Sequence, residues 1–301
     1  MDKQAARSDV YSRVTARILA DLEAGTRPWL KPWRTNGGGA LSRPLRHNGT
    51  PYRCINVLLL WAEAFDRGFE SATWMTYKQA QALGAQVRKG ETGSLVVFAD
   101  RVMKTETNES GDEVMREIAF MKGYIVFNVE QIDNLPAMYR SAVATGAPTQ
   151  STELPAAVEV FFANTGAVFE HGGDHAFYAI DRDIIRLPEQ AAFVDAESYA
   201  ATKAHELIHW TRHPSRLNRD FGRRAFGDAG YAKEELVAEL GAAFLCADLG
   251  ITPEPRPDHA AYLASWLRAL SDDRRFIFTA AAHAQRAVDY LMNASGLAVM
   301  A

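Results

Sequence analysis

The feature that most constrains this chain is the stretch His205-Glu206-Leu207-Ile208-His209, inside a segment, residues 197–212, that we predict to be helical throughout. Residues four apart on a helix leave the same face one turn apart, so His205 and His209 offer two imidazole nitrogens to one Zn²⁺ ion. Glu206 falls beside that ion, where a carboxylate can activate water. The alternative is an ordinary amphipathic helix that happens to carry two histidines and a glutamate.

Two histidines do not complete such a site, because catalytic zinc usually has three protein ligands. Residues 231–249 are predicted to form a helix on which Glu235 and Glu239 are four apart and share a face. This pattern after His-Glu-x-x-His resembles the thermolysin-like (gluzincin) arrangement. The resemblance implies that Glu235 is the third metal ligand and that Glu239 supports a histidine ligand, His205, through its free ring nitrogen. Glu234 is the competing third ligand, although its own face continues to an alanine.

The segment before the metal-binding helix is predicted to contain short strands. Residues 167–180 have the pattern of a strand, a turn and a second strand, and residues 183–187 that of a third strand. In metallopeptidases an edge strand beside the active-site helix holds the peptide substrate by backbone pairing. Tyr178 is therefore predicted to face the metal as a second catalytic residue. His171 and His175 flank a Gly-Gly turn and are interpreted as exposed turn residues rather than ligands.

The front of the chain mixes helix and strand. Apolar residues recur at helical spacing in residues 9–24, and a short helix is expected at 76–83. Residues 94–98 and 121–128 are predicted to be strands that flank a polar tip at 105–117, as in a β-hairpin. We therefore expect the front to be a mixed α/β unit.

Residues 136–155 contain three prolines and little apolar periodicity, as a linker does. The predicted division is a domain at 1–140, a linker at 141–153 and a domain at 154–301. Residues 1–98 carry 14 Lys and Arg against 8 Asp and Glu, whereas residues 151–301 carry 14 against 21. A basic front and an acidic back indicate different partners for the two halves, unless charge merely drifts along the chain.

Some classes of protein are excluded. No apolar run reaches the length of a membrane span, and the N-terminus lacks the apolar core of a signal peptide. Cys54 and Cys246 lie far apart, so neither a disulfide framework nor a cysteine zinc site is indicated. These features predict a cytoplasmic protein with no membrane partner.

Several ordered motifs in the front resemble the N-terminal single-stranded-DNA-binding domain of the ArdC antirestriction family. The resemblance covers most of residues 8–135, except that Cys54 stands where the family usually has glycine. It extends into the back half, whose motifs resemble the zincin-like domain of the same family. The matching front motifs are Leu22-Glu23-Ala24-Gly25 with PWLKPW, Tyr52-Arg53-x-Ile-Asn, Trp74-x-Thr76, Gln79-Ala80, Val87-Arg-Lys-Gly-Glu and Val126-Phe127-Asn128-x-x-Gln131. The back motifs are Trp210-Thr211, His213-Pro-Ser-Arg-Leu-Asn-Arg and Tyr231-x-x-Glu-Glu-Leu-x-Ala-Glu-Leu.

Single-strand binding needs cations to follow the phosphates and aromatic faces on which bases stack. The front supplies both kinds of side chain, although any core and rim would contain some of them. The residues predicted to contact DNA are Trp33, Tyr52, Arg53, Asn56, Trp74, Tyr77, Arg88 and Lys89. Arginines between the two metal-site helices, such as Arg216 and Arg219, are expected to pair with acidic groups of their own domain rather than with DNA.

The predicted fold class is α+β, with an N-terminal mixed α/β domain that binds single-stranded DNA and a mainly helical, zincin-like metallopeptidase domain with a small β-sheet. The expected cofactor is Zn²⁺ or another divalent transition metal. The resemblance implies a bacterial protein, encoded on a plasmid or mobile element, that protects incoming conjugative DNA from host restriction. The partners would be single-stranded DNA and an unidentified protein or peptide substrate. The alternatives are a DNA-binding shield with a structural or vestigial metal site, and a DNA-tethered protease that acts on DNA-bound proteins in repair.

Overall fold

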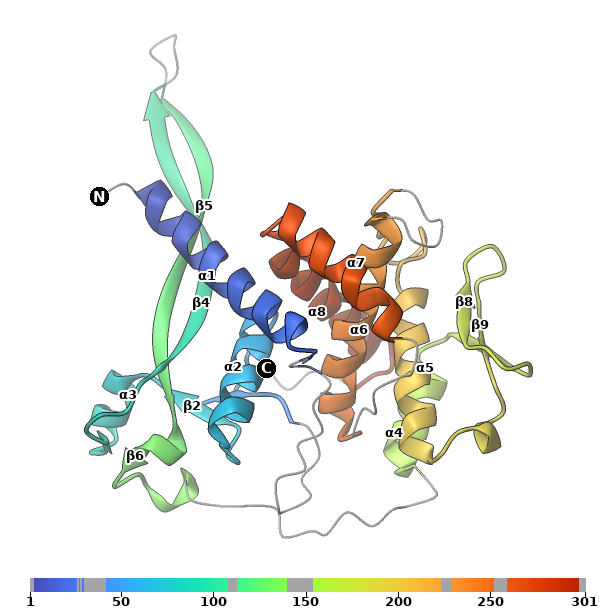
Figure 1. Cartoon of the computed structure of the whole chain (residues 1–301), viewed down its shortest axis with the longest axis horizontal. Helices are drawn as coiled ribbons and strands as arrows, with labels where there is room; N and C mark the ends of the chain where they lie inside the picture. Colours follow the sequence, from blue (N-terminus) through green and yellow to red (C-terminus); the bar gives the residue numbers. More distant parts are fainter. Residues whose placement is uncertain are drawn as a thin grey trace.

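The computed structural model describes residues 3–25, 27, 29, 42–107, 113–139, 154–222, 229–251 and 259–297. Figure 1 shows a long β-hairpin and helix α1 beside a group of helices, with a small sheet at the far side of that group. This two-part α+β arrangement is the fold class that the sequence predicted. None of the described helices is both long and apolar enough to cross a bilayer.

The described N-terminal part contains a four-stranded mixed sheet with the order β1-β2-β5-β4 and a two-stranded sheet of β3 and β6. Its long hairpin pairs β4 with β5 in an antiparallel register that sets Ser94 opposite Val126. The elements are α1 (Lys3–Glu23), β1 (Leu45–Arg46), α2 (Ile55–Arg67), β2 (Thr73–Met75), α3 (Tyr77–Ala82), β3 (Gln86–Val87), β4 (Ser94–Thr107), β5 (Glu113–Asn128) and β6 (Ile132–Asp133). The predicted hairpin is confirmed, but the tip predicted at residues 105–117 was too long. Both strands continue into this range, where alternating polar residues had indicated a loop.

Local chemistry explains where the helices of this part begin. The Thr76 hydroxyl accepts a hydrogen bond from the Gln79 backbone N–H, and the Gln79 side chain accepts one from the Thr76 N–H, which is a capping box. Helix α2 follows Cys54, whose φ of 53° lies in the region that favours glycine. The residue that departs from the family pattern therefore occupies a glycine-like backbone conformation.

The C-terminal part consists of helices and a small three-stranded sheet. The elements are α4 (Ala156–Asn164), β7 (Val168–His171), β8 (Phe177–Ala179), β9 (Ile184–Leu187), α5 (Ala196–Trp210), α6 (Ala229–Leu249), α7 (His259–Asp272) and α8 (Phe276–Ala294). The strand, turn and strand predicted at residues 167–180 implied that β7 and β8 pair with each other, and this pairing is wrong. Strand β9 lies between them, parallel to β7 and antiparallel to β8. It is the most buried and apolar of the three strands, and such a strand occupies the centre of a sheet.

The two parts share one hydrophobic core. That cluster joins residues of α1 and α2 to residues of α4, α5, α6 and α8. Aromatic rings meet across the junction, with Trp29 edge-to-face against Trp266 at 6.3 Å and Trp61 beside Phe244 at 5.9 Å. Aromatic contacts of this kind stabilise beyond the area that they bury. The DNA-directed and metal-directed halves predicted from the sequence are therefore in direct apolar contact.

Candidate metal centre

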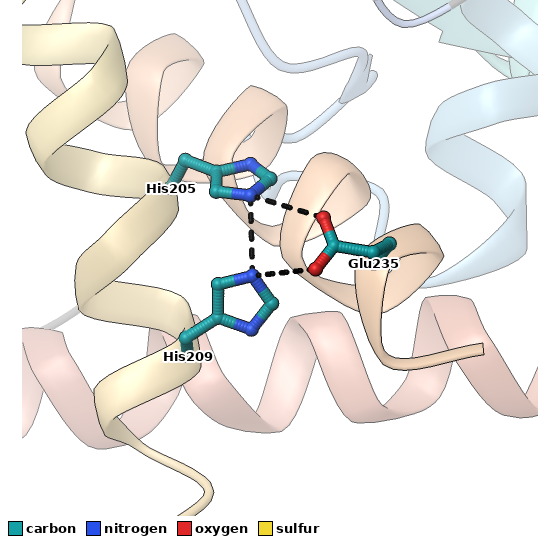
Figure 2. Close-up of side chains that lie close together, drawn as sticks. All are labelled: His205, His209 and Glu235. Atoms are coloured by element: carbon teal, nitrogen blue, oxygen red, sulfur yellow. Dashed lines mark hydrogen bonds and ion pairs between the residues drawn. The ribbon is translucent and has the colours of Figure 1, made fainter. Parts of the chain in front are cut away.

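Helix α5 fixes the two histidines. It begins at Asp195, whose carboxylate accepts a hydrogen bond of 2.7 Å from the Ser198 backbone N–H. Leu207 and Ile208 face the core and are fully buried. His205 and His209 leave another side of the same helix and point together toward α6 (Figure 2).

Three donor groups converge at this place. His205 Nε2 and His209 Nε2 are 3.2 Å apart. Glu235 Oε2 lies 3.6 Å from His205 Nε2, and Glu235 Oε1 lies 3.4 Å from His209 Nε2. Dashed lines mark these three contacts in Figure 2. Ligand atoms that surround one tetrahedral zinc ion at about 2.0–2.2 Å lie roughly 3.4 Å from one another. Among the described residues, these three form the cluster of potential metal ligands, and one donor atom from each lies within 4.8 Å of the other two. Two imidazoles and one carboxylate therefore fit a divalent transition metal.

The charges of this group are coupled. Burial would lower the pKa of His209, but the carboxylates of Glu235 and Glu234 outweigh burial and raise it to about 10. Burial would raise the pKa of Glu235, but the two imidazoles hold it far below its usual value. In the metal-free protein the ionised Glu235 carboxylate therefore faces a protonated His209, and a metal ion would take the place of that proton.

Glu234 supports His209 from the side opposite the converging donors. One of its carboxylate oxygens lies 3.2 Å from His209 Nδ1. Arg219 donates two hydrogen bonds to the same carboxylate, at 2.8 and 2.7 Å, and further bonds to the Thr211 hydroxyl and the Ile208 carbonyl. Burial would raise the pKa of Glu234, but these bonds with Arg219 and His209 lower it to about 2. His209 is thus held in one orientation by a carboxylate that is itself held by a buried arginine.

The sequence named Glu234 only as a rival ligand and did not predict this contact. A helix turns by about 100° per residue, so Glu235 and Glu234 cannot point at the same spot. When Glu235 lies between the histidines, Glu234 lies beside only one of them. The rotation of about 100° between the two glutamates could therefore have predicted this contact from the sequence. The pairing of Arg219 and Arg216 with acidic side chains of their own part agrees with the expectation for these arginines.

The remaining acidic residues of the predicted site are also buried here. Glu239 Oε1 lies 4.0 Å from His205 Nδ1, on the ring edge that faces away from the converging donors. Glu206 is only 4% exposed, and its charge helps to raise the pKa of the neighbouring His209. The structure therefore brings Glu206 and Glu239 to the group, one beside each histidine.

Tyr178 makes a different set of contacts. Its hydroxyl donates to an Asp183 oxygen at 2.8 Å and accepts from the Arg216 guanidinium at 3.1 Å. Burial and the bond to Asp183 raise its pKa, so the phenol stays protonated. Arg216 also stacks on Trp210, the last residue of α5, at 3.8 Å. Tyr178 is thus tied to the end of α5 through Arg216, and its hydroxyl is bonded to the ion pair of Asp183 and Arg216.

The structure distributes the residues predicted to contact DNA unevenly. Tyr52 and Trp74 are buried in the N-terminal core, at 7% and 1% exposure, so neither ring offers a face to a base in this conformation. The Asn56 amide is bonded to both the backbone carbonyl and the N–H of Val97. Sequence alone missed this because aromatic residues beside basic ones are equally typical of a core and its rim.

The other residues of that set keep exposed groups. Arg53 pairs with Asp289 of α8, and Arg88 pairs with Glu91 at 2.7 Å. Tyr77 is 41% exposed, and Lys89 is exposed as well. Trp33 lies outside the described residues.

Comparisons with known proteins cover both parts of the chain. Residues 8–127 match the family described as the N-terminal domain of anti-restriction factor ArdC, and residues 156–283 match a zincin-like metallopeptidase family. The protein y4eC of Sinorhizobium fredii is 42% identical over 94% of this chain and 92% of its own length. An Escherichia coli DNA primase, TraC, is 39% identical over 94% of this chain, which corresponds to only 27% of the primase.

Two solved structures are similar over nearly the whole chain. The metal-free crystal structure of the antirestriction protein ArdC from plasmid R388 is 44% identical, covers 97% of this chain and 99% of its own, and gives a TM-score of 0.83. The Mn(II)-bound structure of the same protein covers 95% of this chain and 97% of its own, with a TM-score of 0.76.

Proposed function

This chain belongs to the ArdC antirestriction family, and we propose that it is a metal-dependent peptidase that acts in association with single-stranded DNA. One observation carries the peptidase proposal: one donor atom each from His205, His209 and Glu235 lie within 4.8 Å of one another, and Glu206 lies in the same helical turn as the histidines. A site that served structure alone would not need this additional carboxylate. Zn²⁺ and Mn²⁺ are the ions that we propose for the site, the second because the related plasmid protein has a Mn(II)-bound structure.

The roles of the residues follow from their placement. His205, His209 and Glu235 would hold the ion, which when bound supplies a Lewis acid that acidifies water and polarises a carbonyl. Glu206 would take the proton of the attacking water and pass it to the departing amine, since peptide hydrolysis needs one group to act as base and then acid. Glu234 and Glu239 would keep the two imidazoles in the orientation and tautomer that bind the ion. Tyr178 would stabilise the developing oxyanion only if its bond to Asp183 is exchanged for one to substrate.

We propose that the N-terminal part supplies the DNA-directed function. Its support is the excess of basic residues in the front of the chain and the similarity to antirestriction proteins and to part of a DNA primase. Restriction acts on DNA that enters a cell, and a plasmid transferred by conjugation arrives as a single strand. The biological role that follows is protection of that incoming DNA in the recipient's cytoplasm.

The test is the conservative variant Glu206→Gln in the full-length protein. We expect it to bind the metal as the wild type does, to bind single-stranded DNA as the wild type does, and to lose cleavage of a fluorogenic peptide library. Antirestriction is then measured as the survival of unmodified plasmid DNA in a restricting host. If the variant protects DNA as well as the wild type, the protein acts as a DNA-binding shield and the peptidase proposal fails.

A further inference from the structure

Two of the aromatic residues that the sequence assigned to DNA, Tyr52 and Trp74, have no exposed face for base stacking, whereas Tyr77 is 41% exposed. Tyr52 and Trp74 are packed with Phe69, Leu60 and Val126 inside the N-terminal core. Non-specific single-strand binding draws much of its affinity from bases that stack on exposed aromatic faces. If this part of the chain binds single-stranded DNA, we therefore look for further exposed rings beside Tyr77.

A row of aromatic rings lies on one face of the β4–β5 hairpin. The register sets Val96 opposite Tyr124, Phe98 opposite Lys122 and Asp100 opposite Phe120. Opposed residues of an antiparallel pair point to the same face, so these side chains lie together. The Phe98 ring centroid is 6.3 Å from that of Tyr124 and 6.1 Å from that of Phe120, and Lys122 Nζ is 5.1 Å from the Tyr124 ring.

This row faces solvent. Phe98 is 46% exposed and Tyr124 is 39% exposed, and Lys122 is exposed between them. Nearer the start of β4 the same face is covered, because Val96 is packed in the N-terminal core, and the row begins where that cover ends. On the opposite face, Leu95 and Met121 pack against the core that contains α1. Figure 1 shows α1 crossing the hairpin obliquely. Exposed apolar side chains that lie in a continuous row, rather than singly, indicate an interaction site.

We propose that the row formed by Tyr124, Phe98 and Phe120, with Lys122, is the platform on which bases of single-stranded DNA stack. The proposal rests on the DNA-directed function proposed above and names its binding surface. The flat faces suit any base, and an exposed lysine beside them can pair with a phosphate. Asp100 shares this face, so the row contributes stacking more than positive charge.

The chemistry of the row favours a nucleic acid over a second copy of the chain. Phe98 and Tyr124 meet edge-to-face, with an interplanar angle of 83°, so the two ring planes do not form one flat apolar sheet. An obligate protein interface has a contiguous apolar centre. Here a lysine and an aspartate lie within the row. Alternating rings and a cation are instead the pattern of surfaces that track a single strand.

The experiment compares two fluorescein-labelled probes, oligothymidine and an abasic oligonucleotide of the same length, by anisotropy with the full-length protein. The Phe98→Ala/Tyr124→Ala variant should bind oligothymidine at least about tenfold more weakly than the wild type, since one stacked base accounts for about a tenfold change in Kd or more. Its affinity for the abasic probe and the slope of log affinity against log salt should not change. Lys122→Gln should instead reduce that slope by about 0.7, the value for one phosphate contact to a single strand.

The matched control is Phe177→Ala, which removes an equally exposed ring, 44% accessible, from β8 in the other part of the chain. It should leave both affinities unchanged. The stacking proposal is wrong, although DNA binding is retained, if the double variant binds oligothymidine as tightly as the wild type does. It is also wrong if the wild-type protein binds both probes with equal affinity. A wild-type dimer that the double variant converts to monomer, with DNA affinity retained, also overturns it. No binding of either probe by the wild type removes the proposed DNA function itself.

Discussion

The contact between Glu234 and His209 gives the sharpest quantitative prediction for the metal centre. The Glu234 carboxylate is 3% exposed and accepts two hydrogen bonds from Arg219, whose side chain is 1% exposed. Glu234→Gln keeps the shape of this side chain but removes its charge and turns one acceptor oxygen into a donor that faces the guanidinium. The Arg219 guanidinium then stays buried opposite a neutral amide that accepts only one of its two hydrogen bonds.

The expected cost follows from the number of charged contacts. A hydrogen bond to a charged group contributes about 1.5–3 kcal/mol, and removal of one member of a buried ion pair costs about 3–5 kcal/mol. We therefore expect the free energy of unfolding of the metal-free protein to fall by about 3 kcal/mol. Loss of the carboxylate that orients a metal-binding histidine typically weakens metal affinity by about 10–100-fold.

The assay is urea unfolding in the presence of a chelator, followed by calorimetric titration of the apo protein with Mn²⁺ and Zn²⁺. The matched control is Glu170→Gln, because Glu170 also bonds an arginine, Arg182, at 3.1 Å, but with both side chains largely exposed. Exposed pairs contribute about 0–1 kcal/mol, so this control should change neither stability nor metal affinity measurably. If Glu234→Gln behaves like the control in both measurements, Arg219 and Glu234 do not hold His209 and the reasoning is refuted.

Three further predictions concern packing. A Cβ at Gly241 of α6 would lie 2.9 Å from three carbons of Ile208. Gly241→Ala should therefore lower the free energy of unfolding by about 1 kcal/mol, because the clash costs about 1–3 kcal/mol and exceeds the gain in helix propensity. In a double-mutant cycle measured by thermal unfolding, this loss should be smaller in an Ile208→Ala background. Cys54→Gly should raise the urea midpoint of unfolding, because it relieves about 1–3 kcal/mol of backbone strain and costs about 1 kcal/mol in the conformational entropy that glycine loses on folding. Cys54→Ala should not raise the midpoint, because alanine keeps the strain. Arg43→Met should lower the free energy of unfolding by about 2 kcal/mol, because the buried guanidinium donates two 2.9 Å bonds to the Asp248 carboxylate, whose side chain is 20% exposed; an unchanged urea midpoint would contradict this.

Much of the site was predictable because its geometry is local. The four-residue spacing of His205 and His209 sets their common face as soon as the helix is recognised, and helix α5 runs close to its predicted bounds. Glu235 required a second helix at the correct rotation, and there the sequence left Glu234 as a rival. The convergence of Glu235 on the histidines, and the use of Glu234 to brace one of them, depends on how α6 packs on α5. Gly241 leaves room for Ile208 at that junction, and these two residues are far apart in the chain.

The sheet topology and the DNA-directed residues were less predictable for a related reason. The order β7-β9-β8 is decided by which strand buries both faces, and this depends on the helices that cover it. Trp74 is buried in the N-terminal core, where Phe69 packs edge-to-face against it at 5.6 Å. Phe98 is 46% exposed because it lies two residues beyond Val96, which the same core still covers. Trp74 and Phe98 are both aromatic residues in or beside strands, and composition alone does not separate them.

Anomalous diffraction from crystals of the wild-type protein soaked in Mn²⁺ or Zn²⁺ tests the metal centre most directly. We predict one strong peak bonded to His205 Nε2, His209 Nε2 and a Glu235 carboxylate oxygen, at about 2.0–2.3 Å from each. The peak should be absent from crystals of His209→Ala. A peak at other residues, or full occupancy that survives the loss of His209, would contradict the assignment of this site.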